Sequence, residues 1–493
     1  LDYNMTLYRW GCRHGLSSLW RPEADTLWSD GSLAFLACIP DGEAIRGHIV
    51  GFSTTCSNLA FTLEMARHIR RIYPKKKIIM GGHGLLMFPH NPRLVPCDLA
   101  DAICCGEGEH TLREVMDKGF ENLEDVAGIF IPGENGWRAT PERDLIRNLD
   151  EIPWPAYEEV RLEDYTNPYL ALVGSRGCVN RCNYCFDRYA SRSQYRTRSA
   201  LHQVDELEDL SGRYRVEHFP YNDSVLNGNV RVLAAKTAEI VRRGLKVSYG
   251  GNLIVRDDMP EELFPALKQS GFNVALMGVE SGSTQTLRCM SKRHTAESAA
   301  RFVRLCHNAG IRTELNFMVG FPTETEEQFR ETLDFIRTNR DCIDAVISAF
   351  TCHVMPSELW KRREEFGIVA EGPDAQRLWH TRDGANTYDV RRRRLNELLD
   401  LCVSLNLMSP ATLCERTAES CDKDTLCCAA FAAFRDDIQT RAASGSPLGA
   451  ETLASLDAWK KQRRNLAVRK TLERFGMWPL AKAAHDLFFR RRA

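Results

Sequence analysis

Three cysteines lie close together in one run of nine residues, which reads Gly177-Cys178-Val179-Asn180-Arg181-Cys182-Asn183-Tyr184-Cys185. An apolar run over residues 170–173 precedes them and predicts a strand, so the cysteines are expected on a loop at its carboxyl end. Three thiolates on one short loop can bind three irons of a 4Fe-4S cubane, because thiolate is the soft ligand that such clusters need. Zinc is the alternative, but a closed zinc site needs a fourth Cys or His, and none lies nearby in the sequence. Since the chain has 18 cysteines, this spacing also arises by chance, and the surrounding sequence has to decide.

The sequence around the cysteines predicts strands and helices in alternation. Helical stretches are expected between the strands, for example over 297–309 and 326–337. Six repeats of this kind predict a partial (β/α)6 barrel, which places its active-site loops at the carboxyl ends of the strands. The six predicted strands cover residues 170–173, 216–221, 246–250, 274–279, 312–319 and 345–351.

Polar or glycine-rich segments follow three of these strands. Asn222-Asp223-Ser224 follows the second strand, Gly-Val-Glu-Ser-Gly at 278–282 follows the fourth, and Met-Val-Gly-Phe-Pro-Thr-Glu-Thr at 318–325 follows the fifth. Met290-Ser291-Lys292 and Pro356-Ser357 lie between or beyond them. In this order, with the cysteine loop, the segments resemble those of the radical S-adenosylmethionine (SAM) superfamily.

The resemblance implies a chemistry and a set of site residues. The three cysteines would ligate a 4Fe-4S cluster and leave its fourth iron for the amino and carboxylate groups of SAM. The residues that would shape the SAM pocket are Tyr184, Asp223, Glu280, Ser281 and Gly320.

A second series of strands and helices precedes the cysteine loop. Predicted strands over 49–53, 77–80, 102–104 and 128–131 alternate with helices over 59–72 and 111–118. Such alternation predicts a parallel, doubly wound, Rossmann-like sheet, which binds ligands at the carboxyl ends of its strands. The first 48 residues show no clear opening strand–helix unit.

Glycines stand at the expected ligand-binding edge of this first sheet. Together with Val50–Thr54 and the Gly81-Gly82-His83-Gly84 and Gly106-Glu107-Gly108-Glu109 runs, they resemble the cobalamin-binding domain fused to many radical SAM proteins. A flavodoxin-like domain that keeps the fold without the cofactor is the alternative. Glycines let the backbone approach a bulky nucleotide tail, and hydroxyls can hydrogen-bond it. The residues expected to line the cobalamin are Ser53, Thr54, Gly81, Gly82 and Gly106.

The resemblance departs from one cobalamin pattern. Proteins that ligate cobalt through histidine carry Asp-x-His-x-x-Gly, and here His14 has Cys12 where the Asp would stand. His48 and His83 are lone histidines, which are more typical of loop or core residues. The axial ligand of cobalt is therefore left open.

The rest of the chain adds a helical region and several local features. The expected domains are 1–147, cobalamin-binding; 148–368, the radical SAM barrel; and 369–493, helical, with a Pro-containing linker over 149–157. The arginine runs 391–394 and 490–492 are expected on solvated helix faces. The cysteines at 402, 414, 421, 427 and 428 fit no auxiliary-cluster spacing, so burial is the simpler interpretation.

Charge and hydropathy limit the partners. The chain has 65 Lys and Arg against 66 Asp and Glu, so it has no overall positive charge that would favour nucleic acid as a partner. It also has no run of about 18 apolar residues, which argues against a membrane partner. Cysteine-rich but without a visible export signal, the chain is expected in the cytoplasm, where thiols stay reduced.

The two resemblances together imply a reaction. A reductase such as flavodoxin or ferredoxin would reduce the cluster, and SAM would yield a 5′-deoxyadenosyl radical. The expected activity is cobalamin-dependent C-methylation of an unactivated carbon in a small-molecule or peptide substrate. A non-methylating rearrangement, cyclisation or oxidation is the alternative within this class, and a non-enzymatic cobalamin carrier or sensor is the alternative outside it.

Overall fold

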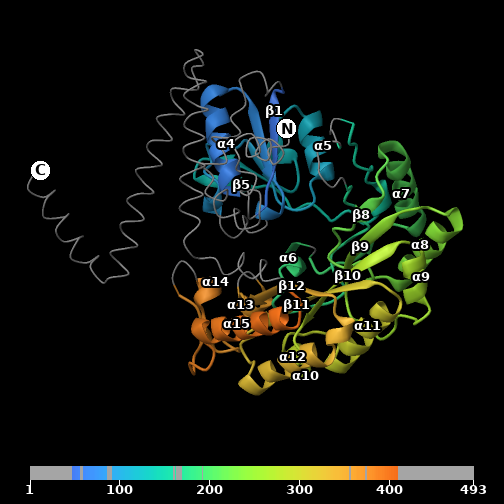
Figure 1. Cartoon of the computed structure of the whole chain (residues 1–493). Helices are drawn as coiled ribbons and strands as arrows, with labels where there is room; N and C mark the ends of the chain where they lie inside the picture. The colour runs from blue at the N-terminus through green and yellow to red at the C-terminus, as the bar shows by residue number, and fades with distance from the viewer. Residues whose placement is uncertain are drawn as a thin grey trace, which may run out of the picture.

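The computed structural model describes two sheet-based bodies of the chain (Figure 1). His14 and the cysteines from Cys414 onward lie outside the described residues. Within the described ranges, no helix combines the length and the apolar character needed to cross a membrane. These ranges are 47–55, 59–85, 92–158, 162, 169–190, 192–354, 357–371 and 375–408.

The N-terminal body is a five-stranded sheet flanked by two helices, α4 and α5 (Figure 1). The neighbouring strands β1, β2 and β3 are parallel, as the alternating pattern predicts. Helix α4 is amphipathic, and its Met65, Ala66 and Ile69 are fully buried. The elements are β1 (Ile49–Ser53), α4 (Leu59–Ile72), β2 (Lys77–Gly81), β3 (Ala102–Cys104), α5 (Glu109–Asp117), β4 (Ile129–Gly133) and β5 (Gly136–Ala139).

The fourth strand differs from the parallel strand that the alternation implies. Strand β4 runs antiparallel to β3 and pairs with β5, a strand that the sequence analysis did not predict. Only Glu134 and Asn135 separate β4 from β5. Two residues can join antiparallel strands, whereas parallel strands need a long crossover, so this turn dictates a hairpin.

The second body is a parallel sheet of five strands in the order β12-β11-β10-β9-β8, as in an open barrel. The predicted first strand contributes a single parallel bridge between Leu172 and Tyr221. Predicted strands 312–319 and 345–351 match β11 and β12 at both ends. The main elements are α7 (Ala200–Tyr214), β8 (His218–Pro220), α8 (Val230–Arg243), β9 (Ser248–Leu253), α9 (Leu263–Gln269), β10 (Phe272–Glu280), α10 (Thr284–Cys289), α11 (Ala296–Asn308), β11 (Arg312–Val319), α12 (Glu326–Thr338) and β12 (Ala345–Thr351).

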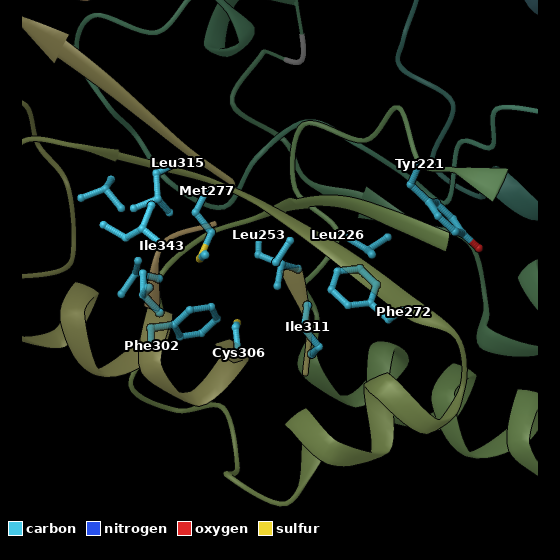
Figure 2. Packing of buried hydrophobic residues seen from close by; sticks show 14 of the residues in the cluster. Tyr221, Leu226, Leu253, Phe272, Met277, Phe302, Cys306, Ile311, Leu315 and Ile343 are labelled. Atoms are coloured by element: carbon cyan, nitrogen blue, oxygen red, sulfur yellow. The ribbon is translucent and has the colours of Figure 1, made fainter. Parts of the chain in front are cut away.

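Alternate residues of each strand form the core between the sheet and its helices. Figure 2 shows Met277 and Leu315 of the sheet together with Phe302 and Cys306 of α11 in this core. The opposite residues of the strands, such as Asn316, are directed away from that core, toward the inside of the open barrel. Helices α11 and α12 therefore fix the outer face of the sheet and leave its inner face for a site.

Helix α15 (Tyr388–Ser404) packs against β12 and α12 at the edge of the open barrel. It overturns the expectation that the arginine run 391–394 lies on a solvated helix face. Arg391 and Arg394 are buried, whereas Arg392 and Arg393 are exposed. Leu398 of the same helix is fully buried in the barrel core. The run is therefore amphipathic: arginines three apart lie on the face of α15 that packs on the protein, where fixed partners hold their charges.

Short elements surround these bodies. They are α6 (Asp187–Ala190), the hairpin β6 (Ser175–Arg176) and β7 (Arg196–Thr197), α13 (Glu358–Lys361), β13 (Ile368–Val369), α14 (Ala375–Leu378) and β14 (His380–Thr381). Strand β13 covers residues 368 and 369, the two residues between which the sequence suggested that the barrel ends and the helical region begins. The domain limits stay a prediction.

Candidate functional site

The three cysteines lie on a loop that begins and ends in a small antiparallel ribbon, β6 and β7. Gly177 starts the loop with φ of 79°, a conformation that favours glycine. All three thiols are free; Cys182 is buried, and Cys178 and Cys185 are half-buried. The loop is held by backbone groups, since Cys185 N–H donates to the carbonyl of Cys182 at 3.3 Å.

The surroundings of the thiols fit a positively charged group. Burial raises the pKa of all three, that of Cys185 to about 11. Neighbouring thiols add to the rise in pKa at Cys178 and Cys185, and the carboxylate of Glu280 adds to it at Cys182. Because thiolates are the ligand form, a cationic cluster would stabilise what burial disfavours. No three His, Cys, Asp or Glu side chains of the described residues converge as ligands of one ion. A cubane needs no such convergence, since each thiolate binds its own iron.

A buried ion pair lies beside the cysteine loop, at the end of β10. The ammonium of Lys292 donates to the carbonyl of Gly278 at 2.8 Å and lies 3.4 Å from Oε1 of Glu280. It also stands 5.9 Å from the ring centre of Tyr184. Burial alone would lower the pKa of Lys292, but the carboxylate of Glu280 and the thiol of Cys182 raise it, so the ammonium stays charged.

Glu280 has two features of a ligand-binding residue. Its backbone is left-handed, with φ of 71°, which is strained for a residue other than glycine. Its second carboxylate oxygen, Oε2, is buried and has no hydrogen-bond partner among the described residues. An acceptor in this state can receive a hydrogen bond from a bound hydroxyl or ammonium.

The other residues expected at the SAM pocket make contacts within the protein. Asp223 accepts hydrogen bonds from the amide of Gly174 at 2.8 Å and the hydroxyl of Ser175 at 2.5 Å, and burial raises its pKa to about 6. The hydroxyl of Ser281 lies 3.0 Å from that of Thr332. These side chains shape the loops after their strands, and contact with SAM stays a prediction for them.

Gly320 takes part in the site only through its backbone, which fixes the loop after β11. Its amide donates to Glu324 at 2.6 Å, and its carbonyl accepts from Asn386 at 3.2 Å. This loop belongs to the segment 318–325, one of those that resemble the radical SAM superfamily. Buried partners therefore fix its backbone on both sides.

A cleft of about 810 Å³ lies between the two bodies. Most of the residues expected at the cobalamin line it, whereas the three cysteines and the residues expected at the SAM pocket are not among its lining residues. From the first body, Ser53, Gly81, Gly82 and Gly106 line it; from the second body, the residues before and after the cysteine loop line it. His83 is exposed on its wall. The lining from the second body comprises Val173, Ser175, Arg176, Gly177, Asp187, Arg196, Asn222 and Ser224.

Thr54 does not line this cleft. It is buried, and its hydroxyl donates to the carbonyl of Gly81 at 2.7 Å. The residue after Gly81 has to be a glycine. Gly82 has φ of 95°, and a Cβ at this position would lie 2.5 Å from the carbonyl oxygen of Thr54. The strand ends of the first body thus meet closely, and their glycines leave the cleft open.

The model of the Radical SAM superfamily matches residues 172–336, which hold the cysteine loop and strands β8 to β11. The chain is a radical SAM enzyme. This finding confirms the barrel and the enzyme class that the motifs predicted.

Curated relatives of this radical SAM enzyme carry different activities in their names. An uncharacterized methyltransferase of Pyrococcus horikoshii is 28% identical over 65% of this chain and 72% of its own length. An anaerobic magnesium-protoporphyrin IX monomethyl ester cyclase of Rubrivivax gelatinosus is 29% identical over 56% of this chain. That match spans only 51% of the cyclase.

Two solved structures share the fold well beyond the barrel. The methyltransferase TsrM of Kitasatospora setae, solved with cobalamin and a 4Fe-4S cluster, has a TM-score of 0.60 at 17% identity over 78% of this chain and 84% of its own. OxsB, a cobalamin-dependent radical enzyme, has a TM-score of 0.57 at 17% identity over 90% of this chain and 74% of its own. The predicted Rossmann-like sheet followed by a partial barrel is therefore confirmed as a fold that this chain shares with these two structures.

Sequence reasoning missed the charged residues of the cleft. Glu107 and Glu109 were quoted only as part of a glycine motif, and Arg176 and Arg196 were not singled out. Their position in the sequence was the available signal, because Arg176 stands two residues before Cys178, the first cysteine of the loop.

Proposed function

We propose that this enzyme binds a 4Fe-4S cluster at Cys178, Cys182 and Cys185, SAM beside it, and cobalamin in the cleft, and that it methylates an unactivated carbon. The observation that carries the proposal is the single cleft of about 810 Å³, which runs from the glycines of the first sheet to the base of the cysteine loop. A corrin bound there would lie next to the cluster loop. When bound, these groups supply a 5′-deoxyadenosyl radical and a methyl group.

The residues of the chain would orient the reactants. The free oxygen of Glu280 would accept a hydrogen bond from SAM, while Lys292 holds the other oxygen. Ser224 donates to Asp187 at 2.8 Å, and both line the cleft, so their positions are fixed before a ligand enters.

Cluster binding is tested on the three cysteines. Replacing Cys178, Cys182 and Cys185 together by Ala should remove the absorption of the anaerobically reconstituted protein near ~400 nm and all 5′-deoxyadenosine formation, since no other protein ligands are proposed. Replacing Cys306, which is buried in α11, by Ala should leave the iron content unchanged. Four irons retained per chain in the triple variant would contradict the assignment.

Cobalamin binding is tested by retention of hydroxocobalamin. We expect about one equivalent to stay with the protein through gel filtration. His83 is the histidine on the wall of the cleft, so Co(II) paramagnetic resonance of the His83→Ala variant reports on the axial ligand. Nitrogen splitting present in the wild type and absent in the variant would identify His83 as that ligand.

Methylation is tested against the non-methylating alternative, which the similarity to a named cyclase supports. The enzyme, loaded with cluster and cobalamin, is reduced with titanium(III) citrate and given SAM labelled in the methyl group. A methylase should form S-adenosylhomocysteine and move label onto the protein-bound cobalamin. If 5′-deoxyadenosine forms without either, cyclisation or another radical outcome takes the place of methylation.

A further inference from the structure

The ribbon that begins and ends the cysteine loop carries two arginines opposite each other. Arg176 of β6 and Arg196 of β7 are register partners. Side chains directly opposite in an antiparallel pair lie about 5 Å apart at their Cβ atoms, and like charges in that position destabilise the pairing. Solvent does little to screen the two charges, since the side chain of Arg196 is only 9% exposed and that of Arg176 only 24% exposed.

A carboxylate from the other body pairs with both arginines. Oε1 of Glu107 lies 3.1 Å from Arg176 and 2.8 Å from Arg196, so one carboxylate bridges the cross-strand pair. Glu109, two residues later, pairs with Arg176 alone. The two glutamates and two arginines thus balance in charge across the boundary between the bodies.

The same carboxylate also holds the segment just before the linker, at Ile146. The amide of Ile146 donates to Oε2 of Glu107 at 2.7 Å, and Arg196 donates to the carbonyl of Ile146 at 2.6 Å. Three segments therefore meet at Glu107: the glycine motif after β3, the segment around Ile146 that precedes the linker, and the ribbon at the base of the cysteine loop. A group held by this many partly buried partners has a fixed position.

We propose that Glu107 is a positioning residue for the cluster loop. By bridging Arg176 and Arg196 at the base of the loop, and with Glu109 balancing their charges, it lets β6 and β7 pair and so sets the spacing of the three cysteines. The N-terminal body thus contributes to cluster assembly although it holds no cluster ligand. The inference rests on the proposed function only in that the cysteines bind a cluster.

The test measures iron in the full-length Glu107→Gln variant after anaerobic reconstitution and gel filtration. Iron per chain should fall by about half or more, because the two arginines then face each other with only Glu109 to compensate. The matched control is Glu114→Gln, which removes a carboxylate paired with Arg143 inside the N-terminal body. Its iron content should equal that of the wild type.

A double variant separates charge neutralisation from simple tethering. Glu107→Gln combined with Arg196→Gln removes one of the two like charges, so iron retention should return close to the wild-type level. If Glu107 and Arg196 served only to tether the two bodies, the double variant should retain less iron than Glu107→Gln alone, since both side chains of the tether are then removed. If Glu107→Gln alone does not fold, the folding and iron content of the double variant decide in the same way.

Three results would overturn the proposal: full iron in Glu107→Gln, no recovery in the double variant, or loss of cobalamin with iron unchanged. The last would place Glu107 in the cobalamin site instead. Failure of the proposed function is distinguishable, because a wild-type chain that takes up no iron would fail before any variant is compared.

Discussion

The side chain of Arg391 fills the space in which any side chain at position 320 would have to stand. A Cβ built on Gly320 would lie 2.2 Å from Cγ and 2.4 Å from Cδ of Arg391. The guanidinium lies 3.9 Å from the ring centre of Trp379 and donates to the carbonyls of Arg377 and Trp379 at 2.8 and 2.7 Å. Because these partners hold Arg391, it cannot yield to a larger neighbour.

Gly320→Ala should therefore destabilise the protein strongly. Gly320 has φ of 74°, which costs an alanine about 1 to 2 kcal/mol, and overpacking adds about 1 to 3 kcal/mol. Gly384→Ala is the matched control, since its φ is 72° and nothing lies within 4 Å of a Cβ there. Urea unfolding should give a larger loss for position 320 than for position 384. Equal losses would mean that Arg391 moves aside freely.

Arg391→Ala and Arg392→Ala should differ although the two residues are neighbours. Arg391 is buried and satisfies two backbone carbonyls, so its loss should cost about 3 kcal/mol or more of the free energy of unfolding. Arg392 is exposed, and its loss should cost at most about 0.5 kcal/mol. Denaturation of both variants under the same conditions checks the difference. A small effect at both positions would restore the solvated-face interpretation.

The limits of prediction follow from how local each signal is. Strand β11 could be predicted to the residue because Leu315, Phe317 and Val319 alternate with other residues and Gly320 ends the run. The burial of Arg391 could not be predicted, because its partners Trp379 and Gly320 come from other segments. Within the run 391–394 every residue is an arginine, so the sequence does not show which of them are buried.

The site shows the same division. The three cysteines, together with the order of the segments that follow the strands, predict a cluster loop without a structure. The direction of the Thr54 hydroxyl, toward Gly81 and away from the cleft, depends on the register between β1 and β2. The pairing of Glu107 with Arg196 depends on how two bodies meet, which no local pattern records.

Lys292→Met should weaken SAM binding while the protein stays folded. Without the ammonium, the buried carboxylate of Glu280 loses its charged partner and its fixed orientation. We expect the affinity for SAM, measured by equilibrium dialysis on reconstituted protein, to fall about tenfold, which corresponds to about 1.4 kcal/mol. Arg293→Met is the control, because Arg293 is the exposed neighbour in the sequence. An unchanged affinity in Lys292→Met would show that Glu280 needs no support.

His294 should make the stability of the protein depend on pH. Burial, and then the nearby charge of Lys292, lower the pKa of His294 from 6.5 to about 4. Between these two values the unfolded chain binds a proton that the folded chain does not, so stability is fully present above pH 6.5 and is lost as the pH falls toward 4. At pH 5 the loss should be about 2 kcal/mol relative to pH 7.5. Urea unfolding of the full chain at both values should show this loss for the wild type and less of it for His294→Gln. The exposed His307, changed to Gln, should leave the loss unchanged. A wild-type dependence that survives in His294→Gln would assign the effect to another group.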